Sequence, residues 1–164
     1  MTEDRLQRRL SALISADVVD YSRLMADDQI ATIRSLKACR ECVAAAVKKF
    51  GGRVSDFVGD NMLAEFPNTR DAVDCSVSIH RSLAELNRNL AVHRRFQFRI
   101  GIHLGDVMFD GRQLFGESVN IAARLEALAQ PGGICKVPRF CFPAFQLPGL
   151  PASNLFHLSS VLRL

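Results

Sequence analysis

Two aspartates far apart in the chain each lie beside an apolar run that predicts a strand. Asp17 lies in SADVVDYSRL, and Asp60 lies in FVGDNMLAEF. Carboxylates that a fold brings together bind hard divalent cations, and such a site can hold a nucleoside triphosphate and let it react. A third segment, GESVNIAARLEAL, places Asn120 and Arg124 four residues apart, so on a helix they share one face. These residue types favour an enzyme.

Each of these residues also has a structural interpretation. An aspartate at a hairpin commonly caps the turn, so either aspartate alone would be structural. Asn120 could cap its helix, and Arg124 could pair with Glu126 or another surface acid. His103, in the apolar run IGIHLGD, fits a packed or interface histidine better than a general base.

Length and composition predict one globular domain. The chain has 164 residues, of which 48% are apolar and 23% charged. Its net charge of +4 is spread over short basic pairs, which does not indicate a nucleic-acid groove. The five cysteines lie mostly in apolar or helical surroundings and indicate reduced thiols, hence a cytoplasmic protein. We find no apolar run of the roughly 18 residues that would predict a membrane span.

The apolar residues alternate between strand and helix periodicity. The alternating run over 96–109 contains Gly101 and Gly105, which mark places where little side-chain bulk is tolerated. The order βαββαβ predicts an α+β fold with a ferredoxin-like core, that is, an antiparallel sheet with helices on one face. We expect strands over 10–19, 53–58, 61–66 and 96–109, and helices over 27–50 and 68–90.

This order brings the two aspartates together. The third strand of such a fold lies between the first and the second and runs antiparallel to the first. The end of the first strand, with Asp17, therefore meets the start of the third, with Asp60. Adjacent carboxylates repel, and one is forced toward protonation unless a cation neutralises the pair.

Four motifs carry a resemblance to a known family. In order and spacing they resemble the catalytic domain of class III adenylate and guanylate cyclases, with bacterial soluble forms the most similar. The resemblance covers about residues 8–137, which we take as the catalytic domain. The motifs are SADVVDYSRLM, GGRVSDFVGDNMLAEF, FRIGIHLGDVMFDG and FGESVNIAARLEALAQPGGIC.

The resemblance implies the chemistry. The two aspartates would bind two Mg²⁺ or Mn²⁺ ions, and the backbone at Val18 and Val19 would cradle phosphates. Asn120 would orient the ribose, and Arg124 would stabilise charge on the transferring phosphate. The family acts as a head-to-tail homodimer, in which one subunit supplies the metals and the other the Asn/Arg helix. The expected reaction converts ATP, or with less support GTP, to the 3′,5′-cyclic nucleotide and pyrophosphate.

Three positions depart from the family pattern. Asp56, four residues before Asp60, replaces the lysine that recognises adenine, and a carboxylate cannot donate to the ring nitrogen. Gln113, seven residues before Asn120, replaces an Asp or Thr and can hydrogen-bond a base edge. Asp20 replaces a glycine near the phosphates, where its charge either opposes a triphosphate or points to solvent.

Residues 138–164 follow neither period, hold four of the six prolines, and have no recognisable counterpart in the family, so we expect a divergent or truncated tail. Two functions stay open. One is an active adenylate cyclase in cyclic nucleotide signalling, favoured by the four retained chemical residues. The other is a catalytically inactive cyclase-like module for nucleotide binding or dimerisation. An RNA-binding sheet is a weaker alternative, because the aromatic pattern that it needs is absent.

Overall fold

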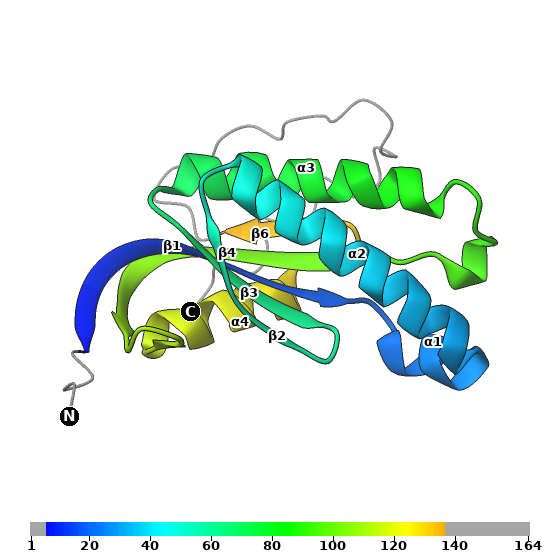
Figure 1. Cartoon of the computed structure of the whole chain (residues 1–164), viewed down its shortest axis with the longest axis horizontal. Coiled ribbons are helices and arrows are strands. Elements are labelled where there is room, and N and C mark those ends of the chain that lie inside the picture. Colours follow the sequence, from blue (N-terminus) through cyan, green and yellow to red (C-terminus); the bar gives the residue numbers. More distant parts are fainter. Residues whose placement is uncertain (1–5, 137–164) are drawn as a thin grey trace, which may run out of the picture.

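The computed structural model describes residues 6–136, which form one curled sheet with helices on both faces (Figure 1). The proline-rich tail predicted for 138–164 lies outside the described residues. The strands are β1 (Gln7–Val18), β2 (Arg53–Val58), β3 (Asn61–Phe66), β4 (Phe98–Phe109), β5 (Leu114–Phe115) and β6 (Ile134–Lys136). The helices are α1 (Tyr21–Asp27), α2 (Gln29–Lys49), α3 (Thr69–Asn87) and α4 (Glu117–Leu128), with a 3-10 turn, η1, at Val92–Arg94.

The strand order confirms the predicted split arrangement. Neighbours follow the order β2-β3-β1-β4-β5, and each of these pairs is antiparallel. β3 therefore lies between β2 and β1, as the element order requires. The short β6 pairs with β4 in parallel, so the sheet is not purely antiparallel.

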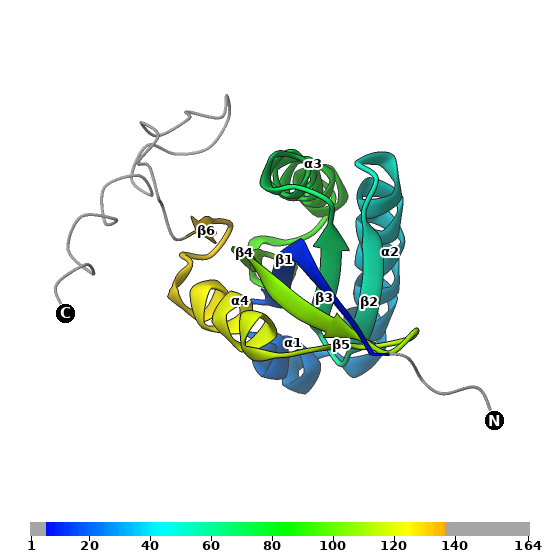
Figure 2. The ribbon, with the colours of Figure 1, turned by 90° about the vertical axis from the view of Figure 1, so that its left-hand side faces the viewer.

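The expectation of helices on one face holds for α2 and α3 but not for α4 (Figure 2). Alternate residues of β1 and β4, such as Ile14 and Ile102, join the main core beneath α2 and α3. The residues between them point to the other face, because side chains alternate along a strand. There Leu13 and Val107 form a second, smaller core with Ala122 of α4.

Local signals set the helix boundaries. The Asp28 side chain accepts a hydrogen bond from the N–H of Ala31, 2.9 Å away, and so caps the start of α2. The side chain of Asn68 caps α3 in the same way. Beyond the end of α2, Gly51 takes the left-handed conformation with φ 71°. None of the helices within residues 6–136 combines the length and the apolar character needed to cross a membrane.

The cysteines of the described residues are free thiols. Burial raises the pKa of both Cys39 and Cys75 to about 12, with the nearby Cys42 adding to the rise at Cys39. Both thiols therefore stay protonated and pack as small apolar side chains.

Candidate active site

Asp17 is the next-to-last residue of β1 and is held by Arg99 of β4. The two residues are direct cross-strand partners. Arg99 donates from Nε to Oδ1 of Asp17 at 3.2 Å and from Nη2 to Oδ2 at 2.8 Å. This hydrogen bonding raises the pKa of Arg99. A paired contact of this kind fixes the plane of the carboxylate and leaves its outer lone pairs available.

Asp60 lies in the turn between β2 and β3, beside the end of β1. The β1–β3 register pairs Ala16 with Met62, so continuing it by two residues brings Asp60 opposite Val18. The predicted proximity of Asp17 and Asp60 follows from this register. The charges of both aspartates also raise the pKa of a third acid, Glu126 of α4.

Glu126 is a buried acid on the inner face of α4, with a side chain only 8% exposed. Burial raises its pKa to about 7, and hydrogen bonding to Asp17 and the charges of Asp17 and Asp60 add to the rise. The positive charge of the Arg99 guanidinium opposes this rise in the pKa of Glu126, because its Nε lies 3.8 Å from Oε1 of Glu126. Asp17 and Glu126 thus share the guanidinium of Arg99, and the charge of Asp60 adds to the negative potential at Glu126.

The oxygen donors of this site fit a hard divalent cation. Within residues 6–136 no three His, Cys, Asp or Glu side chains converge closely enough to hold a metal ion by themselves. Mg²⁺ ordinarily takes one or two protein carboxylates and completes its shell with water and substrate phosphates. Asp17, oriented by Arg99, and Asp60 supply that kind of donor set.

The segment after Asp17 leaves the sheet through a tight turn. Val18 is buried in the main core, and the N–H of Val19 donates to the carbonyl of Gln97 at 2.8 Å. That N–H is therefore already bonded, so a phosphate would have to displace Gln97 or use other N–H groups of the turn. Asp20 has φ 54° and is the only non-glycine residue of 6–136 with positive φ. This conformation explains why a glycine suits the position.

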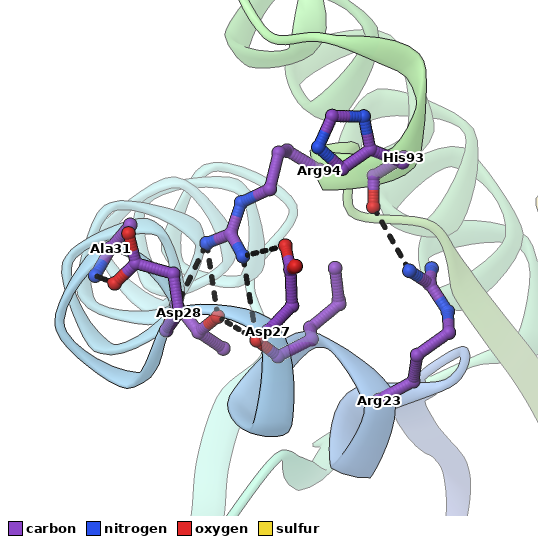
Figure 3. A network of polar contacts seen from close by, with 8 residues as sticks. Arg23, Asp27, Asp28, Ala31, His93 and Arg94 are labelled. Carbon is purple, nitrogen blue, oxygen red and sulfur yellow. Dashed lines mark hydrogen bonds and ion pairs between the residues drawn. The ribbon is translucent and has the colours of Figure 1, made fainter.

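Arg94 fixes the corner between α1 and α2 that follows this turn (Figure 3). Its side chain is 14% exposed and pairs with Asp27 at 2.8 Å. The same guanidinium donates to the carbonyls of Leu24 and Asp28 and to the hydroxyl of Thr32. Its hydrogen bond holds the pKa of Asp27 below the usual range.

α4 lies directly on β4, with no side chain between the helix and the strand at Gly101. A Cβ at this position would lie 2.2 Å from both the carbonyl oxygen of Ala122 and the nitrogen of Glu126. At Gly105 a Cβ would lie 2.3 Å from the hydroxyl of Ser118. Both glycines therefore serve the role predicted for them, since they let α4 approach the strand.

Asn120 and Arg124 lie on the exposed face of α4. The helix begins at Glu117 after Gly116, so Asn120 is inside the helix and is not its cap. Arg124 forms no ion pair within the described part of the chain. Glu126 points to the opposite side of the helix and pairs with Arg99, because residues two apart do not face each other.

Asp56 lies on the same face of the sheet as Asp17. It pairs with Leu63 after an irregularity in β2, and Leu63 pairs in turn with Ser15, two residues before Asp17. Directly paired residues of antiparallel strands share a face. Asp56 is exposed there.

Gln113 lies at the far end of the sheet from Asp17. It follows Phe109, the last residue of β4, and its N–H donates to Oδ1 of Asp110 at 2.8 Å. Arg99, the partner of Asp17, is ten residues of strand earlier, which corresponds to about 30 Å. Gln113 and Asp17 of one chain therefore cannot contact the same small molecule.

Comparison with known proteins settles the family. Residues 9–139 match the family model for the adenylate and guanylate cyclase catalytic domain. The chain belongs to this family. A protein of Rhizobium meliloti named "Putative adenylate cyclase 3" is 42% identical to this cyclase domain over 135 residues. The match covers 82% of the present chain but 23% of the Rhizobium protein, so the chain spans less than a quarter of that relative's length.

Solved structures agree with the fold of this cyclase domain. The crystal structure of an adenylate/guanylate cyclase/hydrolase from Silicibacter pomeroyi is 36% identical, with a TM-score of 0.74 over 80% of this chain and 77% of that one. A bacterial light-regulated adenylyl cyclase, at 23% identity and TM-score 0.71, covers 76% of this chain and 41% of its own and shares the fold. The predicted family and fold are both confirmed.

Two residues of this candidate site, Arg99 and Glu126, were not found from the sequence. Arg99 contacts Asp17 through the register of two strands that are distant in the sequence, and composition does not reveal register. Glu126 did leave a signal. It is an acid on the face of α4 that otherwise buries Ser118, Ala122 and Leu125, and a charge on a buried helix face needs a partner.

Proposed function

We propose that this chain is an adenylate cyclase unit that converts ATP to 3′,5′-cyclic AMP and pyrophosphate in cyclic nucleotide signalling. In this reaction the ribose 3′-oxygen bonds to the α-phosphorus, the bond from that phosphorus to the bridging oxygen breaks, and the hydroxyl proton leaves to solvent. One observation carries the proposal. Asp17 meets Glu126 where α4 covers the sheet, whereas Asn120 and Arg124 lie on the exposed face of the same helix, so the two sets of groups face different substrates unless two chains combine.

Asp17 and Asp60 would hold the divalent cations, Mg²⁺ or Mn²⁺. A bound cation lowers the pKa of the attacking hydroxyl and neutralises charge on the leaving pyrophosphate. Before a cation binds, Arg99 keeps the Asp17 carboxylate in one orientation.

Asn120 and Arg124 would act on the substrate of a second copy of the chain. Their exposure leaves the amide and the guanidinium free to reach across a head-to-tail dimer. Arg124 suits the transferring phosphate, because a guanidinium binds phosphate oxygens with two parallel donors. The position of Gln113, about 30 Å along the sheet from its own Asp17, also requires a second chain if it is to contact the base.

The side chain of Gln113 can pair with the adenine of ATP. A carboxamide both donates and accepts, and the ring nitrogen and exocyclic amine of adenine offer one acceptor and one donor. Asp56, which only accepts when ionised, can take a hydrogen bond from the exocyclic amine. The choice of ATP over GTP is supported by the name of the Rhizobium relative, "Putative adenylate cyclase 3".

Mixing two inactive variants tests the composite site. Purified Asp60→Asn and Arg124→Ala chains should each lose cyclic AMP formation with Mn²⁺ and ATP. In an equal mixture about half of the dimers pair one chain of each kind and contain one intact site, so about a quarter of the wild-type activity should return. Arg81→Ala, at an exposed arginine of α3, is the control and should keep full activity.

The outcomes separate the alternatives. A mixture as inactive as its components would refute the shared site. Nucleotide binding by the wild type without cyclic product would favour the inactive module. Cyclic GMP as the main product, from GTP supplied at equal concentration, would refute the assignment of ATP and leave the cyclase activity in place.

A further inference from the structure

The Arg99–Glu126 pair connects the two halves of the proposed site. We propose that Arg99 and Glu126 are positioning residues, through which a divalent cation at Asp17 fixes the position of α4, the helix that presents Asn120 and Arg124 to a second copy of the chain. The inference rests on the proposed function for the roles of Asp17 and α4.

The first link is the hold of Arg99 on Asp17. Both carboxylate oxygens accept from the same guanidinium, at 3.2 and 2.8 Å. The Asp17 side chain is 20% exposed and that of Arg99 is 33% exposed, so water screens this pair only partly. A cation that binds the remaining lone pairs of Asp17 repels the guanidinium and weakens this hold.

The second link is the approach of Arg99 to Glu126. The same Nε that donates to Asp17 lies 3.8 Å from Oε1 of Glu126, just beyond hydrogen-bond distance. Glu126 is nearly excluded from solvent, and Arg99 is its one ion-pair partner among the described residues. A guanidinium that withdraws from Asp17 therefore moves toward a buried carboxylate that already attracts it. The ion pair of Arg99 with Asp17 then becomes weaker, and its ion pair with Glu126 becomes stronger.

The third link is the contact between α4 and β4. Glu126 is part of the helical turn that rests on Gly101, where backbone meets backbone with no intervening side chain. A stronger pull on the Glu126 side chain thus presses this turn onto the strand. Packed elements of this kind move as units rather than deform continuously.

The fourth link is the helix itself. Arg124 lies two residues from Glu126 and on the opposite face, and Asn120 lies one turn earlier on that same outer face. A tighter contact between the inner face of α4 and β4 therefore fixes the positions of Asn120 and Arg124, which would serve the other active site. Coupling of two sites through one element is reciprocal, so substrate held by Arg124 should also strengthen cation binding at Asp17.

Mn²⁺ binding to the full chain, followed by the electron paramagnetic resonance of free Mn²⁺, tests the first two links without any turnover. Glu126→Gln keeps the size of the side chain and removes its charge, and we expect it to weaken Mn²⁺ binding about tenfold, as loss of a residue that supports a metal ligand commonly does. Glu117→Gln, at an exposed acid in the first turn of the same helix, should bind as the wild type does.

Amide hydrogen exchange tests the links to the helix. At saturating Mn²⁺ the amides of 117–128 should exchange more slowly in the wild type and in Glu117→Gln, but not in Glu126→Gln. Arg99→Lys keeps the charge and loses the paired donors, so it should also abolish the response, and it serves as the test if Glu126→Gln does not fold.

Equal Mn²⁺ affinity in Glu126→Gln and the wild type would overturn the inference, as would an undiminished exchange response in Glu126→Gln and Arg99→Lys. These results are independent of cyclase activity. A wild type that shows both responses but forms no cyclic nucleotide would refute the proposed function and leave the inference standing. An active wild type whose helix ignores Mn²⁺ would do the reverse.

Discussion

Replacement of Gly101 by alanine should separate α4 from the sheet by about 1 Å. The added Cβ would lie 2.2 Å from two backbone atoms of α4, whereas ordinary contacts begin near 3.4 Å. Backbone atoms within a helix cannot rotate aside, so the whole turn must withdraw. Overpacking of this kind costs about 1–3 kcal/mol, and we expect Gly101→Ala to fall at the upper end, about 3 kcal/mol.

The second effect of Gly101→Ala is on catalysis. Movement of α4 shifts Arg124 in the proposed site of the second chain, and a misplacement of about 1 Å can cost about a hundredfold in rate. The assays are urea unfolding followed by circular dichroism and cyclic AMP formation with Mn²⁺ and ATP. A loss of about 3 kcal/mol should also lower the melting temperature by roughly 6–12 °C in a domain of this size.

Gly51→Ala provides the control for Gly101→Ala. Gly51 has φ 71° with no atom within 4 Å of an added Cβ, so alanine there suffers only the cost of the left-handed conformation, about 1 kcal/mol. The difference between the two variants isolates the packing of α4. If Gly101→Ala proves no less stable than Gly51→Ala, the close contact between helix and strand is not what the geometry indicates.

Three further predictions follow from single residues. Burial lowers the pKa of His80 to about 4. The free energy of unfolding should therefore fall as the pH drops from about 6.5 to 4, by up to roughly 3 kcal/mol. Urea unfolding at several pH values should show that His80→Gln removes this dependence. Asp20→Gly should raise stability by about 1 kcal/mol by relieving its positive φ, and an unchanged melting temperature would contradict that explanation. Arg94→Met should cost about 2–3 kcal/mol by leaving its acceptors unpaired, with Arg94→Lys between it and the wild type.

The elements whose signals are local could be predicted from the sequence. The strands expected over 53–58 and 61–66 match β2 and β3, because the alternation of apolar residues marks each strand and Gly59, with φ 59°, forms the turn between them. The place of this hairpin beside β1 followed from the element order, which puts the turn with Asp60 beside the end of β1 that carries Asp17. The seven-residue helix α1 was missed, because so short an element carries too few residues to show a period.

The electrostatics of the site could not be predicted in the same way. The expected repulsion between two aspartates took no account of Arg99, whose contact with Asp17 depends on the β1–β4 register. The sequence suggested Glu126 as a surface partner for Arg124, whereas the helix buries Glu126 beneath itself. Which face of α4 meets the sheet depends on its close contact with Gly101 of β4. A helical period alone does not distinguish the face that will be buried from the face that stays exposed.

The last residues before and at the start of β4, 96–99, have little freedom to gain or lose a residue. Asn87 holds Phe96 through hydrogen bonds to both its N–H and its carbonyl. Gln97 then binds the turn after β1, and Arg99 binds Asp17. Deleting one residue here would turn Arg99 toward the opposite face of the sheet, because side chains alternate along a strand. Insertions and deletions among relatives should therefore avoid 96–99, although the segment lies at the entrance to a surface loop.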